Sequence, residues 1–229
     1  NRDVNSMRKL IAENALTVLK KTDAVFFPLT AKKDSVKKQI VYVNVGNSAN
    51  NAMANRMRMD YDADVINFSY QQNDSETAKM ISEIKNKYNK VIIGIHNYTR
   101  FPANNFGISK NAVDLVTQLQ QKTKAITFVF GNVYAVKNWC NAKNLVACYE
   151  DDSIVQNAAV DLLQGKIAAQ GKLPVTVCEQ LKFGTGITFK APNPVKAAKG
   201  ILDAAKLTAI DAIAEDAIAK GATPGAVVL

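Results

Sequence analysis

The chain has 229 residues, of which 48% are hydrophobic and 21% charged, a composition that suits a globular fold with a sizeable core. The formal net charge is +9, but the basic residues are mainly lysines spread over loops and helix faces without interleaved aromatics, so we expect no nucleic-acid partner. No apolar run approaches the roughly 18 residues needed to cross a bilayer, so we expect no transmembrane segment.

The first part of the chain predicts a helix, an extended segment and then a strand followed by a helix. Residues 5–21 place one apolar stripe at helical spacing, formed by Met7, Leu10, Ile11, Ala15, Val18 and Leu19. Residues 25–29 are predicted to be extended, because Pro28 disfavours a helix there. After a lysine-rich loop, residues 39–45 form a β-branched run that predicts a strand, and Ser48 is placed to cap a helix through about Met57.

The same strand and helix unit then recurs along the chain. Strands are predicted at residues 65–69, 91–95, 125–130 and 145–149. Helices are predicted to begin at Asp74 or Ser75, at Ser109 and at Ser153, and Gly165 is placed to end the last one. Short apolar strands that alternate with amphipathic helices indicate an α/β fold: an open, doubly wound, mostly parallel sheet with helices on both faces, plus a C-terminal linker and helix.

Ligands of doubly wound sheets bind beyond the carboxyl ends of the strands. The dipeptides expected there are Gly46-Asn47, Ser69-Tyr70, His96-Asn97, Gly131-Asn132 and Glu150-Asp151.

The end of the chain predicts a domain boundary. Residues 171–177 close the α/β alternation, so residues 1–188 are assigned to one domain. Residues 189–202 lose apolar periodicity and contain Pro192 and Pro194, which is typical of a linker. A helix is expected over residues 207–220, followed by the start of an apolar strand after Pro224. We therefore expect residues 203–229 to begin a second domain, and the sequence to be a piece of a longer protein.

Several segments together resemble the C-terminal α/β domain of glycoside hydrolase family 3, particularly β-N-acetylhexosaminidases of the Bacteroides type. The segments lie at residues 11–19, Pro28-Leu29, 95–97, 105–107, 130–135, Tyr149-Glu150, 171–175 and 183–187. The resemblance covers most of residues 5–188. Val133 departs from it, because the family's strand-end turn commonly reads Gly-Asn-Pro-Tyr. The tail after Leu207 looks like the opening of a serine β-lactamase-related domain.

The resemblance implies a glycosidase whose catalytic pair lies outside this chain. In that family the aspartate nucleophile, and in its N-acetylglucosaminidase branch the acid/base histidine, belong to a preceding barrel domain. The resemblance thus implies an accessory domain with no catalytic residues or cofactor of its own. Its partners would be the barrel of the same polypeptide and the carbohydrate substrate, terminal β-linked N-acetylhexosaminides. It also implies the periplasm or cell envelope. The full-length protein would be an enzyme and this piece inactive.

The candidate site residues lie on and after the strand that ends at His96. His96 is the single histidine of the chain, and a structural hydrogen-bonding role is favoured for it over a catalytic one. The loop over residues 97–107 is long for a strand-to-helix connection, and long loops often bind ligands or neighbouring domains. We expect a substrate-facing or barrel-facing surface there, formed by His96, Asn97, Tyr98, Arg100, Asn104 and Asn105.

Other motifs favour ordinary structural roles. Asp60, Asp62 and Asp64 have the spacing of a calcium loop but lack its glycine and its glutamate, so no metal site is expected. The carboxylates of residues 150–152 are interpreted as helix-start charges. Cys140, Cys148 and Cys178 show no paired spacing, which predicts small buried apolar residues rather than a disulfide framework.

Two further patterns resemble catalytic or cofactor-binding motifs but are incomplete. Ser35 and Ser82 each begin a Ser-x-x-Lys pattern, but neither has the partner motifs of an acyl-transfer site. Gly46 follows a strand but lacks the other glycines of a dinucleotide fingerprint. The alternatives to an accessory glycosidase domain are a stand-alone flavodoxin-like module that binds a small ligand, with nucleotide at the Gly46 and Gly131 turns, and a structural spacer between two hydrolase domains.

Overall fold

The computed structural model describes residues 2–30, 38–194, 212–213, 215–216 and 219–220. The chain divides into two compact units, residues 1–194 and residues 195–229. Most of the linker and of the helix expected at residues 207–220 lies outside the described residues.

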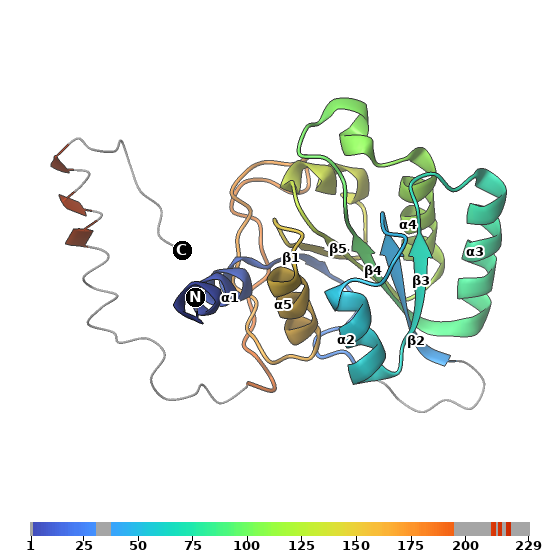
Figure 1. The fold of residues 1–229 in the computed structure, drawn as a ribbon, viewed down its shortest axis with the longest axis horizontal. Helices are drawn as coiled ribbons and strands as arrows, with labels where there is room; N and C mark the ends of the chain where they lie inside the picture. The colour runs from blue at the N-terminus through green and yellow to red at the C-terminus, as the bar shows by residue number, and fades with distance from the viewer. Residues whose placement is uncertain (1, 31–37, 195–211, 214, 217–218, 221–229) are drawn as a thin grey trace. The chain divides into compact units, whose positions relative to one another are not determined.

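The first unit is built on one six-stranded sheet with the order β1-β6-β5-β4-β2-β3 (Figure 1). Its strands are β1 (Thr17–Lys21), β2 (Lys38–Val45), β3 (Asp64–Phe68), β4 (Tyr88–Ile95), β5 (Ala125–Val129) and β6 (Asn144–Ala147). All neighbours pair in parallel except β1, which runs antiparallel to β6. The predicted doubly wound, mostly parallel α/β fold is confirmed.

Helices cover both faces of this sheet. They are α1 (Arg2–Ala15), α2 (Ala52–Tyr61), α3 (Asp74–Lys87), α4 (Lys110–Lys122) and α5 (Ser153–Leu163), with short 3-10 segments η1 (Ala103–Gly107) and η2 (Val133–Trp139). One core cluster joins the sheet to α1, α2 and α5, and the other joins it to α3, α4 and η2. The central strands are apolar on both faces because both faces are covered.

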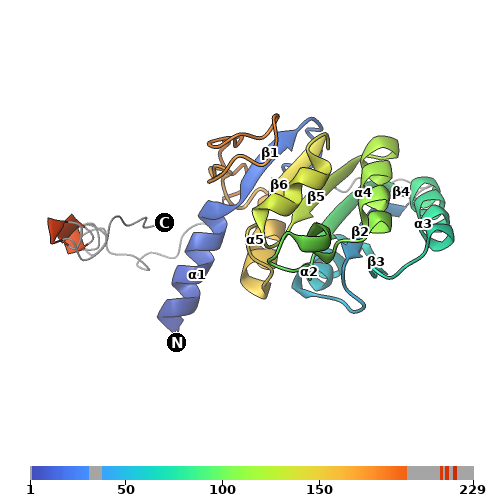
Figure 2. The same ribbon diagram turned by 90° about the horizontal axis from the view of Figure 1, so that it is seen from above.

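The helix predicted at residues 5–21 is wrong from Leu16 onward. The helix ends at Ala15, and Thr17 begins the edge strand β1, whose register runs from Thr17 opposite Ala147 to Lys21 opposite Asn144. The apolar stripe continues through Val18 at helical spacing, so periodicity does not mark the break. Pairing with the open edge of β6 decides the conformation, and it buries Val18 completely. Figure 2 shows α1 extending away from the sheet, with residues 3–10 exposed.

Three helix starts differ from the predictions by a few residues. Asn51 caps α2 in place of Ser48, Asn73 caps α3 with a capping box, and Asp152 caps α5 so that Ser153 is the first helical residue. In each case an Asn or Asp side chain accepts from a backbone N–H in the first turn, a role that several polar residues near a helix start can fill equally well. Ser109 caps α4 as predicted.

A disulfide joins Cys140 and Cys178, which corrects the prediction that all three cysteines are reduced apolar residues. The two cysteines are 38 residues apart, so no local spacing announces the pair. They meet because the segment after α5 folds back on the sheet and buries Leu173 and Leu181 in the same cluster that contains Cys140. Cys148 is free and buried, as predicted.

Candidate functional site

The site lies where the winding of the sheet changes direction. Strands β2 and β4 are neighbours, yet α2 packs on one face of the sheet and α4 on the other. Such a switch point is the place where doubly wound sheets bind ligands. Here it is formed by the end of β2 at Asn44 and Gly46 and by His96, directly after β4.

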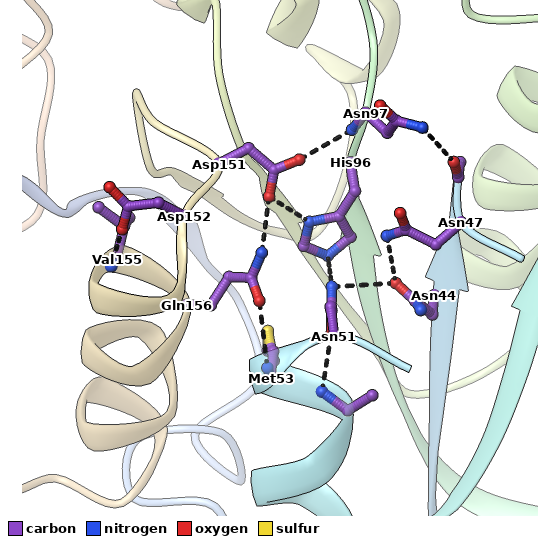
Figure 3. Close-up of polar contacts among 12 residues, drawn as sticks. Asn44, Asn47, Asn51, Met53, His96, Asn97, Asp151, Asp152, Val155 and Gln156 are labelled. Atoms are coloured by element: carbon purple, nitrogen blue, oxygen red, sulfur yellow. Dashed lines mark hydrogen bonds and ion pairs between the residues drawn. The ribbon is translucent and has the colours of Figure 1, made fainter. Parts of the chain in front are cut away.

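His96 is fully buried and engaged on both ring nitrogens (Figure 3). Its Nδ1 lies 2.8 Å from Oδ1 of Asp151, and its Nε2 lies 2.7 Å from the hydroxyl of Tyr42 and 3.1 Å from Nδ2 of Asn51. The ring stacks on Phe130 with the centroids 4.4 Å apart. The contacts of His96 thus join β2, β4, the segment after β5 and the segment after β6.

The chemistry of the partners assigns the tautomer of His96. An ionised carboxylate can only accept hydrogen bonds, so Nδ1 donates to Asp151. Nε2 of the neutral ring then accepts from the Tyr42 hydroxyl. Burial raises the pKa of Tyr42 far above its ordinary value, so this hydroxyl remains protonated and able to donate. Gly94 leaves the space for this bond, because a Cβ there would lie 2.2 Å from Oη of Tyr42 and 2.4 Å from Nε2 of His96.

Asp151 accepts three hydrogen bonds from two parts of the chain. Besides His96, the backbone N–H of Asn97 donates to Oδ2 at 2.8 Å and Nε2 of Gln156 donates to Oδ1 at 2.8 Å. Burial by itself raises the pKa of Asp151, but the hydrogen bonds from His96, the Asn97 N–H and the Gln156 amide outweigh burial and lower the pKa. The interpretation of Asp151 as a helix-start charge is therefore incomplete. Asp152 is the residue that caps α5.

The lowered pKa of Asp151 predicts an acid-sensitive contribution to stability. The folded pKa lies below the unfolded value of about 4, so this stabilisation is complete above pH of about 4 and is lost as the pH falls through the folded pKa. We expect the difference in unfolding free energy between the wild type and Asp151→Asn to shrink steadily below pH of about 4. Urea unfolding at several pH values measures it, with Asp3→Asn on the exposed start of α1 as control. A difference that stays constant down to pH of about 2 would contradict the assignment.

Asparagine side chains fill the rest of the switch point. Asn44 donates to Oδ1 of Asn67 at 2.8 Å and accepts from Asn47 at 2.9 Å and from Asn51 at 3.1 Å. Nδ2 of Asn97 donates to the carbonyl of Gly46 at 3.2 Å. These amides satisfy one another across β2, β3 and β4, so the chain's own side chains occupy the place where other doubly wound domains hold a ligand.

The glycine turns are also filled by the chain itself. The missing Cβ of Gly46 would lie 2.8 Å from the hydroxyl of Tyr70, and that of Gly131 would lie 3.2 Å from the ring of Tyr98. Tyr70 donates to the His96 carbonyl, and Tyr98 to the Asn132 carbonyl. These glycines therefore give room to tyrosine rings rather than to phosphates, which disfavours the nucleotide-binding alternative.

The loop over residues 97–107 divides the candidate residues into two sets. Tyr98 faces inward against the buried Phe106, and Asn105 donates to the Ile108 carbonyl. Asn97, Arg100 and Asn104 are exposed. Of the six residues that the sequence groups together, the structure places His96, Tyr98 and Asn105 in buried or partly buried positions, and the other three on the surface.

The exposed loop surface continues into the next turn. The side chain of Asn132 donates to the Arg100 carbonyl at 2.8 Å, which ties the loop to the start of η2. Phe101 on the loop is 76% exposed and Tyr134 on η2 is 46% exposed. We call Arg100, Phe101, Asn104 and Tyr134 the loop surface. Sequence reasoning named Arg100 and Asn104 but missed the two aromatics, although Phe101 lies in the predicted loop and Tyr134 closely follows the predicted strand end at Gly131-Asn132.

Backbone conformation in this loop is unusual. Asn104, Asn105 and Phe106 have positive φ angles of 49°, 53° and 61° and are followed by Gly107 at 76°. For a residue other than glycine, the left-handed conformation costs about 1–3 kcal/mol in free energy, and residues in this conformation cluster at functional sites. The burial of Phe106 holds the turn in place.

The acidic residues that mimic a calcium loop have other structural roles. Asp60 binds Arg56 at 2.7 Å, Asp64 accepts from the Tyr88 hydroxyl at 2.6 Å, and Asp62 ends α2 in the left-handed conformation. In the part of the chain that the structure describes, no three His, Cys, Asp or Glu side chains group as metal ligands. None of the described helices has the length and apolar character needed to span a membrane.

The fold and the site together define a doubly wound α/β domain. Its own side chains fill the switch point of the sheet, and the loop that follows β4 presents exposed residues. Solved structures share this fold. A β-N-acetylglucosaminidase of glycoside hydrolase family 3 from Paenibacillus sp. str. FPU-7 matches 74% of this chain at 19% identity with a TM-score of 0.57. A fungal multi-domain family 3 β-N-acetylglucosaminidase matches 75% at 18% identity with a TM-score of 0.57. A β-glucosidase from Listeria innocua, in complex with glucose, matches 74% at 12% identity with a TM-score of 0.55.

These matches confirm the fold that the sequence resemblance implies: the chain folds like the C-terminal α/β region of those enzymes. The matched region is 19% of the fungal chain, 32% of the Paenibacillus chain and 26% of the Listeria chain, so this chain corresponds to a minor part of each. No family model and no curated protein matches the sequence.

Proposed function

We propose that this chain is the accessory α/β domain of a glycoside hydrolase of family 3 that removes terminal β-linked N-acetylhexosamine residues. A barrel domain of the same polypeptide would supply the nucleophile and the general acid/base. The fold likeness supports the family, and two of the solved neighbours are β-N-acetylglucosaminidases.

The proposal of an accessory role rests on the burial and the hydrogen bonds of His96. A general acid or base must reach the proton that it transfers. His96 is 0% exposed, and its two ring nitrogens are held by Asp151 and Tyr42. It is also the single histidine of the chain. The side chain therefore serves the architecture of the strand ends, and catalysis belongs elsewhere in the polypeptide.

We further propose that the loop surface faces the barrel or the substrate. It combines an exposed cation, an exposed amide and two exposed aromatic rings on a loop fixed by Phe106 and Asn132. Exposed aromatics on a rigid loop offer contact area at little cost in conformational entropy.

Kinetics of the full-length polypeptide test this surface. Arg100→Ala and Phe101→Ala are expected to lower kcat/KM for a chromogenic N-acetylglucosaminide about 10-fold to 100-fold, because each removes a contact worth about 1.4–2.8 kcal/mol. The isolated chain is expected to show no turnover.

The matched control is Met59→Ala, which removes an 81% exposed apolar side chain from α2, outside this loop. It should leave kcat/KM unchanged. Unchanged kinetics for Arg100→Ala and Phe101→Ala would favour the structural spacer instead, and turnover by the isolated chain would refute the accessory role.

We propose an exported protein, in the periplasm or at the cell envelope. The disulfide between Cys140 and Cys178 supports this, because structural disulfides persist in oxidising compartments. We also propose that residues 203–229 begin a β-lactamase-related domain. The division of the chain after Pro194 is compatible with a boundary there.

A further inference from the structure

The fold sorts charged residues toward the two ends of the sheet. At the end where the parallel strands finish, acidic residues gather: Glu150, Asp151 and Asp152 follow β6, and Asp74 and Glu76 lie in the first turn of α3. The helices return to the other end, where the parallel strands begin (Figure 1). There, lysines from several elements gather on the part of the rim that runs from β1 to α3.

Five residues form this surface, which we call the lysine rim: Lys21, Lys85, Lys122, Lys124 and Lys143. Lys21 ends β1 and lies opposite Asn144, so Lys143 is its neighbour across the strand pair. Lys124 directly precedes β5, the next strand in the sheet. Lys122 and Lys85 lie in the last turns of α4 and α3 and line the same groove between these helices. Neighbouring strands are about 4.8 Å apart, so the strand ends that carry these lysines lie side by side.

Most of the lysine rim has no opposite charge beside it. In the described part of the chain, no carboxylate lies within ion-pair distance of four of its members: Lys21, Lys122, Lys124 and Lys143. Three of these four are exposed, and Lys21 is half-buried. Asp23, which follows β1, accepts a hydrogen bond from Nδ2 of Asn144 at 2.8 Å. The rim is therefore a local concentration of positive charge.

Helix dipoles explain only part of this concentration. A cation in the last turn of a helix is stabilised by the dipole of that helix, which accounts for Lys85 and Lys122. Lys21, Lys124 and Lys143 lie at strand ends, outside the helices. The fold gives these three ammonium groups no opposite charge, and an external anionic surface would supply one.

We propose that the lysine rim binds the anionic headgroups of a phospholipid bilayer. Lysine carries a compact charge on a flexible stem, which suits phosphates that move within a fluid surface, whereas fixed recognition of a phosphate favours arginine. In this arrangement the ends at which the parallel strands begin face the membrane. The loop surface follows the opposite ends of β4 and β5, so it stays accessible on the side away from the bilayer.

The composition of the rim favours a bilayer over a protein or a nucleic acid. The centres of protein interfaces are enriched in aromatic residues and arginine and depleted in lysine. Proteins that bind single-stranded nucleic acid stack its bases on aromatic side chains. None of the large hydrophobic side chains exposed in the described residues lies on α3, α4, β1, β5 or β6. The rim thus offers charge without a platform for stacking or an apolar centre.

Cosedimentation of the 229-residue chain with lipid vesicles tests the proposal. The probes are vesicles of phosphatidylcholine with about 30% phosphatidylglycerol and vesicles of phosphatidylcholine alone. The chain should bind the anionic vesicles at least about 100-fold more tightly than the neutral ones, since each lysine near an anionic surface raises the affinity about 5-fold. This binding should be lost when NaCl is raised from about 0.05 M to about 0.5 M, because salt screens the attraction.

A triple variant locates the binding surface. Lys122→Gln, Lys124→Gln and Lys143→Gln combined should lower the affinity for anionic vesicles about 100-fold.

The matched control removes the same net charge elsewhere. It combines Lys9→Gln on α1, Lys79→Gln in the middle of α3 and Lys137→Gln on η2, all of which are exposed. It should lower the affinity by less than about 3-fold, because these lysines lie outside the rim and their attraction to the bilayer is screened. Equal losses in the two triple variants would mean that net charge alone drives binding, and would overturn the proposal.

Acetylation of lysine amines gives a second readout on the unmodified chain. Anionic vesicles should slow the acetylation of Lys124 and Lys143 at least about 5-fold and leave that of Lys9 and Lys79 unchanged. If the triple variant of the rim does not fold, this protection pattern decides alone. A wild type that binds neither kind of vesicle, or both equally, would overturn the proposal. Preference for a short DNA duplex over anionic vesicles would also overturn it. This inference does not depend on the proposed glycosidase function.

Discussion

Replacing both Cys140 and Cys178 by alanine is expected to lower the free energy of unfolding by about 3–4 kcal/mol. The disulfide closes a loop between residues 38 apart, and this loop restricts the unfolded chain far more than the folded one. For a domain of this size the melting temperature should fall by roughly 10 °C. Thermal unfolding of the double variant, and of the wild type with and without dithiothreitol, measures the effect.

Cys148 supplies the control for this experiment. It is free and buried in the core cluster on the α2 and α5 side of the sheet. Burial raises the pKa of its thiol well above the ordinary value, so it should react with a maleimide only after unfolding. Cys148→Ala should cost about 1 kcal/mol and leave the response to dithiothreitol intact. A wild type that melts at the same temperature with and without reductant would contradict the disulfide.

His96→Ala is expected to destabilise the chain by about 3–5 kcal/mol, because it opens a cavity beside Phe130 in place of a fully buried ring and leaves Asp151 and Tyr42 without the hydrogen-bond partner that they share. His96→Phe keeps the ring stacked on Phe130 but loses both hydrogen bonds. His96→Gln keeps an amide that can donate to Asp151 and accept from Tyr42. We therefore expect the loss of stability to be largest for Ala, smaller for Phe and smallest for Gln.

Urea unfolding at pH 7 measures this order. If His96→Phe were as stable as the wild type, packing against Phe130 would explain the burial of His96, and the bonds to Asp151 and Tyr42 would contribute nothing net. If His96→Gln were the least stable of the three, the hydrogen-bonded role assigned to the imidazole would be wrong.

Candidate site residues were predictable where position along a strand determines them. A residue that follows a parallel strand lies at the carboxyl edge of the sheet whatever its neighbours are, so the sequence correctly places His96 and the loop after it. The bond between His96 and Asp151 was not predictable. The two residues are 55 apart, and their meeting depends on β6 lying beside β5 in the order of the sheet. Nothing in the local sequence around Asp151 separates a histidine partner from a helix cap.

The sequence by itself determined the class of fold and the faces of its main elements, because hydrophobic periodicity and capping are local properties that each segment carries alone. Tertiary structure decided whatever depends on two distant segments meeting. Thr17 joins the sheet as a strand because the edge of β6 offers it backbone partners. Cys140 reaches Cys178 because the C-terminal segment folds back onto the core. The lysines of the rim likewise come together only when the whole chain is assembled, since pairing is a property of two strands and not of one.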